Sequence, residues 1–181
     1  MILFFGPPGS GKSVQGDLLV QRNEWQWLST GQLFRDSKDP EVLQRLASGE
    51  LIDDALTNKV LASALEKIDT TINVVLDGYP RNTEQAQWLM DNLTQFNRMI
   101  ECVVKFDVPT EEIVKRLSER GRAEDGPDVV QHRLEIYREK TKPVLEYFRG
   151  KNVPLVTIDG VGSVDEVHER IQEAVEACLH P

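Results

Sequence analysis

An eight-residue loop near the start of the chain limits its fold more than any other segment. It reads Gly6-Pro-Pro-Gly-Ser-Gly-Lys12-Ser13 and directly follows the apolar run Met1-Ile-Leu-Phe-Phe5. This is the pattern G-x-x-x-x-G-K-[ST], whose glycines let backbone N–H groups turn toward a triphosphate while the next helix adds its positive end. A Gly/Pro-rich surface turn is the competing interpretation, but it requires neither the strand before the loop nor the helix after it. We therefore expect a nucleoside triphosphate site that includes Gly9, Ser10, Gly11, Lys12, Ser13 and Val14.

The size and charge of the chain exclude several classes of protein. Its 181 residues, 40% of them hydrophobic, suit one domain with its own core. A net charge of −9 argues against a nucleic-acid partner, because binding to a phosphate backbone depends on clustered cations. No apolar stretch approaches the roughly 20 residues that cross a bilayer, so we expect no membrane partner. Since Cys102 and Cys178 suggest neither a disulfide framework nor a metal spacing, and no signal peptide is evident, we expect a cytoplasmic protein.

Short apolar runs alternate with helical patterns along the chain. This alternation predicts an α/β fold, a P-loop NTPase core with a five-stranded parallel sheet and helices on both faces. Two segments fit this alternation poorly. The segment at about residues 30–60 is helical without a strand, and the segment at about residues 121–128 is a polar loop with glycine and proline. We expect both to be mobile flaps on a single domain of residues 1–181. The predicted strands are Ile2 to Phe5, Glu24 to Leu28, Asn73 to Leu76, Cys102 to Phe106 and Leu155 to Ile158, and capping boxes are predicted at Asn82 with Gln85, Asp128 with Gln131 and Ser163 with Glu166.

A second element with chemistry is the apolar run Val74-Val75-Leu76, which ends in Asp77. A carboxylate at such a strand end is where P-loop enzymes orient Mg²⁺ and its waters. A strand-ending Asp is as often only a turn residue, so Asp77 alone leaves both interpretations open. The nearby Arg81 favours the first one. We therefore expect Mg²⁺ near Ser13 and Asp77, bound directly or through water.

The segment Asp77-Gly78-Tyr79-Pro80-Arg81 resembles the D-G-[FY]-P-R signature of adenylate kinases and related nucleoside monophosphate kinases. The resemblance continues over nearly the whole chain. Ser29 to Arg35 is similar to the family's S-T-G-[DE]-[ML]-[LF]-R element, and Gly49 to Ile52 to its G-x-[LI]-[VI] segment. Further matches are Phe106-Asp107-Val108-Pro109 with Arg116 and Arg120 ahead of a short lid, and Arg122, Glu124, Asp125, Arg133 and Leu134 at the lid exit.

The resemblance implies a role for each matching residue in transfer of the ATP γ-phosphoryl group to AMP. Arg116 would stack on the donor adenine, and the loop around Gly162 would close on the donor base. Arg120, Arg122 and Arg133 would converge with Lys12 on the phosphates. The implied AMP site consists of Thr30, Arg35, Glu50, Leu51, Ile52, Gly78, Tyr79, Pro80, Arg81 and Gln85, together with Arg122 and Arg133.

The many arginines have a physical reason in such a reaction. Two nucleotides bring several negative charges together, and arginine stays charged and binds phosphate oxygens in pairs. Single surface arginines more often make weak salt bridges, but an ordered set of six at the family's spacing favours the phosphate role. A phosphate acceptor is already ionised, so no general base is needed. We therefore expect His132, His168 and His180 to be solvated surface residues.

Several positions depart from the family pattern. Ser13 and Val14 stand where the family has Gly and then Thr, so either Ser13 binds Mg²⁺ or Asp77 holds the metal through water. The flap between Gly31 and Gly49 is shorter than usual, and Gln32 replaces an acidic residue. The short lid lacks the four-ligand metal knot of long-lid relatives. We expect Mg²⁺ with ATP and no zinc.

Two other functions compete with an adenylate kinase. Asn82 after Arg81 also occurs in UMP/CMP kinases, but Thr30 and Gln85 match adenylate kinases, and the Gln85 amide suits an adenine edge. A P-loop switch that binds nucleotide without phosphoryl transfer would not need a second phosphate site. It would also carry N-K-x-D for guanine, which the run from Asn58 to Leu61 lacks. We expect ATP and AMP as partners, and a monomer, as is common among relatives of this size.

Overall fold

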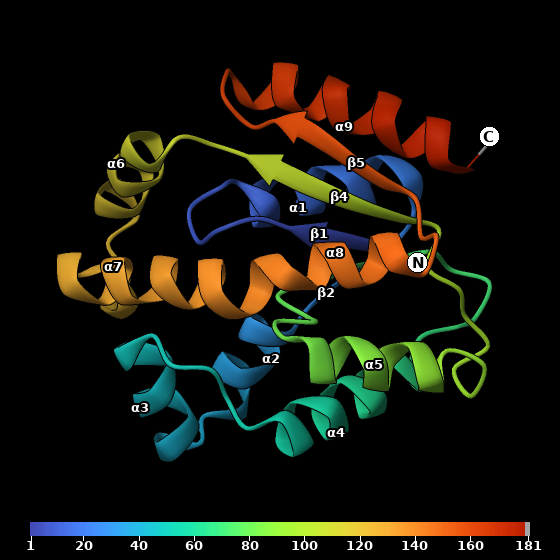
Figure 1. The fold of residues 1–181 in the computed structure, drawn as a ribbon, viewed down its shortest axis with the longest axis horizontal. Helices are drawn as coiled ribbons and strands as arrows, with labels where there is room; N and C mark the ends of the chain where they lie inside the picture. Colours follow the sequence, from blue (N-terminus) through green and yellow to red (C-terminus); the bar gives the residue numbers. More distant parts are fainter. Residues whose placement is uncertain (180–181) are drawn as a thin grey trace.

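Five parallel strands form one sheet in the order β2-β3-β1-β4-β5, which confirms the predicted α/β architecture (Figure 1). The computed structural model describes residues 1–179. Ile2 of β1 pairs with Val75 on one side and Cys102 on the other, so the first strand lies at the centre of the sheet. The loop that follows β1 therefore starts from the middle of the carboxyl edge, where ligands bind in open α/β sheets. The strands are β1 (Ile2–Phe5), β2 (Gln26–Ser29), β3 (Val74–Asp77), β4 (Cys102–Asp107) and β5 (Leu155–Asp159).

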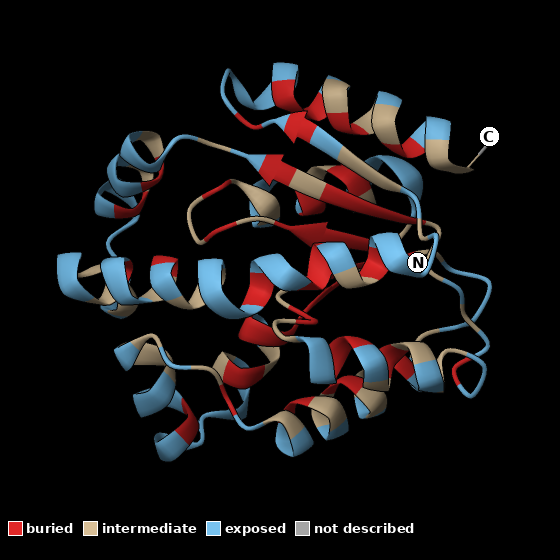
Figure 2. Cartoon of the chain, viewed as in Figure 1, coloured by how far each residue is buried: buried red, intermediate tan, exposed pale blue. Residues whose placement is uncertain are grey.

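The side chains of β1 divide between two hydrophobic layers. Leu3 and Phe5 pack in one layer with residues of α4, α5 and α8, and Ile2 and Phe4 pack in the other with residues of α1 and α9. Alternation follows from the two-residue period of a strand. The central strand β1 and most of its neighbour β4 are red in Figure 2, because helices cover both faces of the sheet, whereas the edge strand β5 is largely tan and blue. The helices are α1 (Lys12–Asn23), α2 (Thr30–Ser37), α3 (Pro40–Ser48), α4 (Asp54–Leu65), α5 (Thr83–Asn92), α6 (Thr110–Arg120), the 3₁₀ turn η1 (Ala123–Asp125), α7 (Pro127–Ile136), the π-helical turn η2 (Tyr137–Thr141), α8 (Lys142–Gly150) and α9 (Val164–Leu179).

The predicted helix starts are partly confirmed. Ser163 and Glu166 form a capping box, with Ser163 N donating to Glu166 Oε2 at 2.7 Å and Glu166 N donating to Ser163 Oγ at 3.3 Å. Asn82 caps α5 by accepting from the Gln85 backbone at 2.8 Å, although the Gln85 side chain binds elsewhere. The prediction for Asp128 is wrong. Gly126 occupies the N-cap and proline the first turn of α7, because the fixed φ of proline suits that position.

The two segments that did not fit the predicted alternation of strands and helices correspond to α2 to α4 and to η1. Figure 1 shows α2, α3 and α4 below the sheet, and α6 and α7 flanking the lid segment. Phe34, Val42 and Ile52 form a small hydrophobic cluster of their own within the first of these segments. Within residues 1–179, no helix is both long enough and apolar enough to cross a membrane.

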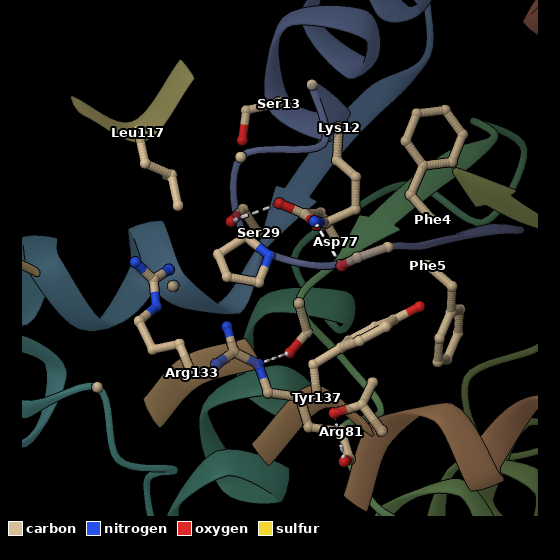
Figure 3. Close-up of a pocket in the computed structure, with 18 of the residues that line it drawn as sticks. Phe4, Phe5, Lys12, Ser13, Ser29, Asp77, Arg81, Leu117, Arg133 and Tyr137 are labelled. Atoms are coloured by element: carbon tan, nitrogen blue, oxygen red, sulfur yellow. Dashed lines mark hydrogen bonds between the residues drawn. The ribbon is translucent and has the colours of Figure 1, made fainter. Parts of the chain in front are cut away.

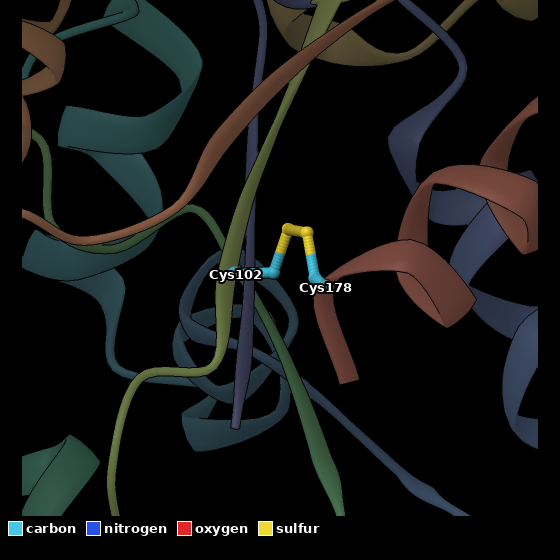
Figure 4. The surroundings of a disulfide bond; sticks show 2 residues. All are labelled: Cys102 and Cys178. Atoms are coloured by element: carbon cyan, nitrogen blue, oxygen red, sulfur yellow. A yellow bond between two sulfur atoms is a disulfide. The ribbon is translucent and has the colours of Figure 1, made fainter. Parts of the chain in front are cut away.

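The two cysteines are paired, which corrects the expectation of no disulfide. Cys102 in β4 and Cys178 in α9 form a disulfide bond, with Cα atoms 5.9 Å apart (Figure 4). They are 76 residues apart in the sequence. Only the packing of α9 over β4 brings them together, so their spacing could not reveal the pair.

His168 is fully buried, so the expectation of a solvated surface residue is wrong. Gln15 in α1 donates from Nε2 to the Val164 carbonyl, so its Oε1 faces His168 Nδ1 at 3.2 Å. A carbonyl oxygen only accepts, so Nδ1 is the donor in this contact. Burial lowers the pKa of His168, which favours the neutral ring. His132 is exposed as expected, and His180 lies outside the described residues.

Candidate active site

A cavity of about 460 Å³ opens at the carboxyl ends of β1 and β3. Figure 3 shows Lys12, Asp77, Arg81 and Arg133 around it, although they come from three separate parts of the chain. Cavities of this size hold small-molecule ligands. The position agrees with the rule that parallel sheets bind ligands where their strands end.

Lys12 is held by the loop that it terminates. Its Nζ donates to the carbonyl oxygens of Gly6 and Pro7 at 2.8 and 2.9 Å, and to Ser10 Oγ at 3.3 Å. Gly9 and Gly11 have φ values of 80° and 95°, which let the loop turn back over the lysine. The pKa of Lys12 is lowered to about 8, chiefly by burial; the nearby Asp77 carboxylate opposes this shift, and the arginines around the cavity add to it.

Asp77 ends β3 beside the loop and is only 6% exposed. Its Oδ2 accepts a hydrogen bond from Ser29 at 3.4 Å, whereas its buried Oδ1 has no hydrogen-bond partner in the described chain. Buried oxygens are nearly always satisfied, so this one is suited to a cation or to a metal-bound water. Ser13 is exposed on the rim of the same cavity. No group of three His, Cys, Asp or Glu side chains able to hold a metal occurs among residues 1–179.

The lid arginines gather around two acidic residues. Arg120 binds both carboxylate oxygens of Asp125, at 2.8 and 2.5 Å. Arg133 donates to the Glu124 carbonyl at 3.2 Å and lies 3.5 Å from Asp125. Burial, together with the positive charges of Arg81 and Arg120, lowers the pKa of Arg133 to about 10. Arg120 and Arg133 are therefore fixed at the edge of the cavity.

Arg81 lies at the other end of the cavity. Its Nε donates to the Gly78 carbonyl at 2.7 Å, and the same carbonyl accepts from Thr30 Oγ1 at 2.9 Å. Burial lowers the pKa of Arg81, while the Asp77 carboxylate opposes that effect. Gly78 has a φ of 77°, which places its carbonyl in reach of both donors. Thr30, Gly78 and Arg81 form a second polar centre, separate from the loop of Lys12.

Comparison with known proteins identifies the family. The profile of the adenylate kinase family matches residues 4–153. The adenylate kinase of Mycobacteroides abscessus is 39% identical over 180 residues, which cover 96% of this chain and 98% of that protein. The chain belongs to the adenylate kinase family. The adenylate kinases of Mycolicibacterium smegmatis and Nocardia farcinica are each 37% identical over the same shares.

Most residues that the adenylate kinase signature pointed to line the same space. The six predicted arginines all line the main cavity, as do Lys12 and Asp77. A second cavity of about 10 Å³ shares Leu51, Gly78 and Arg81 with the first and adds Thr30, Ile52 and Gln85. The other predicted residues on the main cavity are Gly9, Gly11, Ser13, Val14, Tyr79 and Pro80.

Three predicted residues line neither cavity. Ser10 is buried beneath the loop, where its hydroxyl contacts Lys12. Glu50 is exposed. Gly162 belongs to the loop before α9, and that loop meets the site through Gly160, whose carbonyl accepts from Arg116 Nη2 at 3.0 Å. Arg116 is also held by Glu112 at 2.7 Å, so it is fixed near the expected donor base.

The resemblance missed two cavity residues on the turn η2. Tyr137 and Thr141 follow Arg133 at intervals of four, a helical spacing that could have placed them on the same face. The hydroxyl of Tyr137 is buried without a hydrogen-bond partner in the described residues, and burial together with Asp107 raises its pKa to about 12. Thr141 donates to the Arg81 carbonyl at 2.9 Å. Single π-helical turns of this kind are frequent at functional sites.

Proposed function

We propose that this member of the adenylate kinase family transfers the γ-phosphoryl group of ATP reversibly to AMP, forming two ADP. The observation that carries the proposal is the convergence of Lys12 and six arginines on one cavity. The cavity contains two polar centres, one at the loop of Lys12 and one at Thr30, Gly78 and Arg81. A protein that only holds a triphosphate would need the first and not the second.

The positive charge of the cavity would offset the repulsion between the phosphates of the two nucleotides. Two like charges about 4 Å apart cost on the order of 4 kcal/mol at an effective dielectric constant of about 20, and two nucleotides create several such pairs. Lys12, Arg120, Arg122 and Arg133 would neutralise the phosphoryl group in transfer, while Arg35 and Arg81 would hold the acceptor phosphate. An acceptor phosphate oxygen forms the new bond to the γ-phosphorus as its bond to the β–γ bridging oxygen breaks. No proton has to be removed, so positioning and charge suffice.

Mg²⁺ would arrive with ATP and would supply positive charge that offsets the charge of the phosphates. Asp77 would hold it through the unsatisfied Oδ1 or through water, and the Ser13 hydroxyl would add a ligand from the loop. A site that needs phosphate oxygens to complete it is typical of Mg²⁺. Arg116 and the loop from Gly160 to Gly162 would contact the donor base. Leu51, Ile52 and Gln85 line the small cavity and would contact the acceptor base.

We also propose that the protein works as a monomer, because all seven cations that line the cavity belong to one chain. The flaps at residues 31–60 and 121–133 would close over both nucleotides and exclude water, which otherwise accepts the phosphoryl group. Hydrogen exchange with and without a bisubstrate analogue tests this closure. Equal protection of both segments in the two states would contradict it.

The decisive experiment is an assay for ADP from ATP, Mg²⁺ and AMP, repeated with CMP, UMP and GMP. We expect AMP to be the best acceptor, and a preference for CMP or UMP would favour the UMP/CMP kinase alternative. Lys12→Ala and Arg81→Ala should each reduce turnover at least about 100-fold. Arg149→Ala is the matched control, because Arg149 is exposed and pairs with Glu146 away from the cavity. Full activity of the Lys12 and Arg81 variants would refute the proposal.

A further inference from the structure

The side-chain amide of Gln85 is held at both ends by groups of opposite polarity. Its Oε1 accepts from the backbone N–H of Arg81 at 2.8 Å, and its Nε2 donates to Asp54 Oδ1 at 2.7 Å. A backbone N–H cannot accept and a carboxylate cannot donate, so only one orientation of the amide satisfies both contacts. Gln85 is 2% exposed, which makes an unsatisfied contact costly.

Asp54 is the residue that completes this arrangement. It lies in the first turn of α4, where a carboxylate is favoured by the positive end of the helix. Both of its oxygens also accept from Asn82 Nδ2 at 3.0 Å, and Asn82 caps α5 at the Gln85 backbone. One carboxylate of the flap therefore fixes the side chain of Gln85 and, through Asn82, the start of the helix that carries it.

The fixed amide still has unused hydrogen-bonding capacity. One Nε2 hydrogen and one Oε1 lone pair remain, and Gln85 lines the small cavity together with Thr30 and Ile52. The adenine edge offers a donor at its 6-amino group and an acceptor at N1, whereas a 6-oxopurine reverses both. An amide free to turn by 180° could match either edge, but an amide held by Asp54 and by the Arg81 backbone N–H matches only one of them in a given pose.

We propose that Asp54 determines acceptor specificity by fixing the orientation of Gln85, so that the site accepts a 6-aminopurine monophosphate and rejects a 6-oxopurine one. Asp54 is a positioning residue in this role, since it acts through Gln85. The inference rests on the proposed function, because it requires the acceptor base to lie in the cavity at Gln85.

The test measures kcat/KM for AMP and for IMP at saturating ATP and Mg²⁺. IMP differs from AMP only at the 6-position and N1, so the ratio of the two kcat/KM values measures how well the site distinguishes this edge of the base. The wild-type protein should favour AMP, and Asp54→Asn should lower the AMP:IMP ratio at least about tenfold, the size of one charge-assisted hydrogen bond. Asp54→Glu keeps a carboxylate, so its AMP:IMP ratio should be closer to the wild-type ratio than that of Asp54→Asn.

Asp53→Asn is the matched control. Asp53 is the adjacent residue, is exposed, and caps α4 by accepting from the Leu56 backbone at 3.0 Å, a role that asparagine also fills. Its AMP:IMP ratio should equal that of the wild type. Equilibrium binding of AMP and IMP gives the same ratio if turnover of a variant is slow.

An unchanged ratio in Asp54→Asn overturns the inference, and so does an equal loss of activity or affinity for both nucleotides, because a purely structural role predicts that result. Failure of the wild-type protein to phosphorylate either nucleotide would instead refute the proposed function and remove this inference with it. The two failures are therefore distinguishable.

Discussion

Arg120 binds Asp125 through two parallel contacts, with its Nε and Nη2 at 2.8 and 2.5 Å from the two carboxylate oxygens. The same carboxylate accepts from the Arg122 backbone at 2.9 Å and lies 3.5 Å from Arg133 Nη1. Asp125 thus holds together the three lid residues proposed to act on the phosphates. Its side chain is only 3% exposed, so these contacts are shielded from solvent.

Replacing Asp125 with Asn should lower the free energy of unfolding by about 1–2 kcal/mol at pH 7, because charge-assisted hydrogen bonds are lost. Burial alone would raise the pKa of Asp125, but the hydrogen bonds from Arg120 and Arg122 outweigh it and hold the pKa below its usual value. The stabilisation is therefore complete above the unfolded pKa near 4 and is lost as pH falls through the lower native value. Urea unfolding of both proteins from pH 7 downward should show the two curves converging in acid. A constant difference would contradict the assignment.

The pKa of Lys12 near 8 predicts a pH dependence of ATP binding. Above pH 8 the free protein loses the charge on Lys12, so the Kd for ATP should rise, by up to about tenfold for each pH unit, until the bound lysine also titrates. Arginine stays charged throughout, so Lys12→Arg is the control and should show a flatter profile between pH 7 and pH 9.5. A wild-type Kd that does not change over this range would contradict the assigned pKa.

The same pKa makes a prediction about stability. Burial lowers the native pKa of Lys12 from 10.5 to about 8, so the charged form is penalised in the folded protein. Between these values the unfolded chain binds more protons than the native one, and the free energy of unfolding therefore rises with pH. Relative to a Lys12→Met variant, the wild-type protein should gain stability from pH 8 to pH 10.5. Denaturant titrations at several pH values measure this difference, and an opposite slope would contradict it.

Thr141 should act on the acceptor through Arg81. Thr141→Val removes the hydrogen bond to the Arg81 carbonyl, so Arg81 loses a restraint. We expect the KM for AMP to rise about three- to tenfold while the KM for ATP stays nearly constant. Thr141→Ser keeps the hydroxyl and should behave like the wild type. An equal rise in both KM values would point to a general loss of structure.

The bond between Cys102 and Cys178 should stabilise the fold. It closes a segment of 76 residues, and a crosslink of this span contributes about 2–4 kcal/mol, chiefly by restricting the unfolded chain. Reduction, or the Cys178→Ser substitution, should therefore lower Tm by roughly 5–15 °C. Thiol titration of the unfolded, unreduced protein is the control and should detect no free thiol. Two titratable thiols under oxidising conditions would contradict the pairing.

The loop and strands were predictable from sequence because each depends on residues a few positions apart. The glycine spacing from Gly6 to Gly11 determines whether the backbone can fold around Lys12, and the strands after Met1 and Asn73 follow from short apolar runs. Asp128 shows the limit of such reasoning. A capping pattern was present, yet Pro127 took the first turn and the cap moved to Gly126.

The resemblance placed the arginines in one site, but it could not say what each would bind. Gln85 was expected to offer its amide to a base, and the structure adds that Asp54 and Arg81 hold both ends of that amide. The spacing of Tyr137 and Thr141 from Arg133, in steps of four residues, could have predicted that they line the cavity. No pattern indicated that the intervening turn would be π-helical.

The phosphate-binding loop, the α/β alternation and the cationic residues of the site could all be derived from the residues, because local backbone geometry and residue chemistry do not depend on distant contacts. Three contacts became known only from the folded chain: the pairing of Cys102 with Cys178, the burial of His168 against Gln15, and the contact of Asp54 with Gln85. These pairs are separated by 76, 153 and 31 positions. Contacts over such distances arise when helices pack on a sheet, and the shape and burial of those interfaces cannot be read from the residues alone.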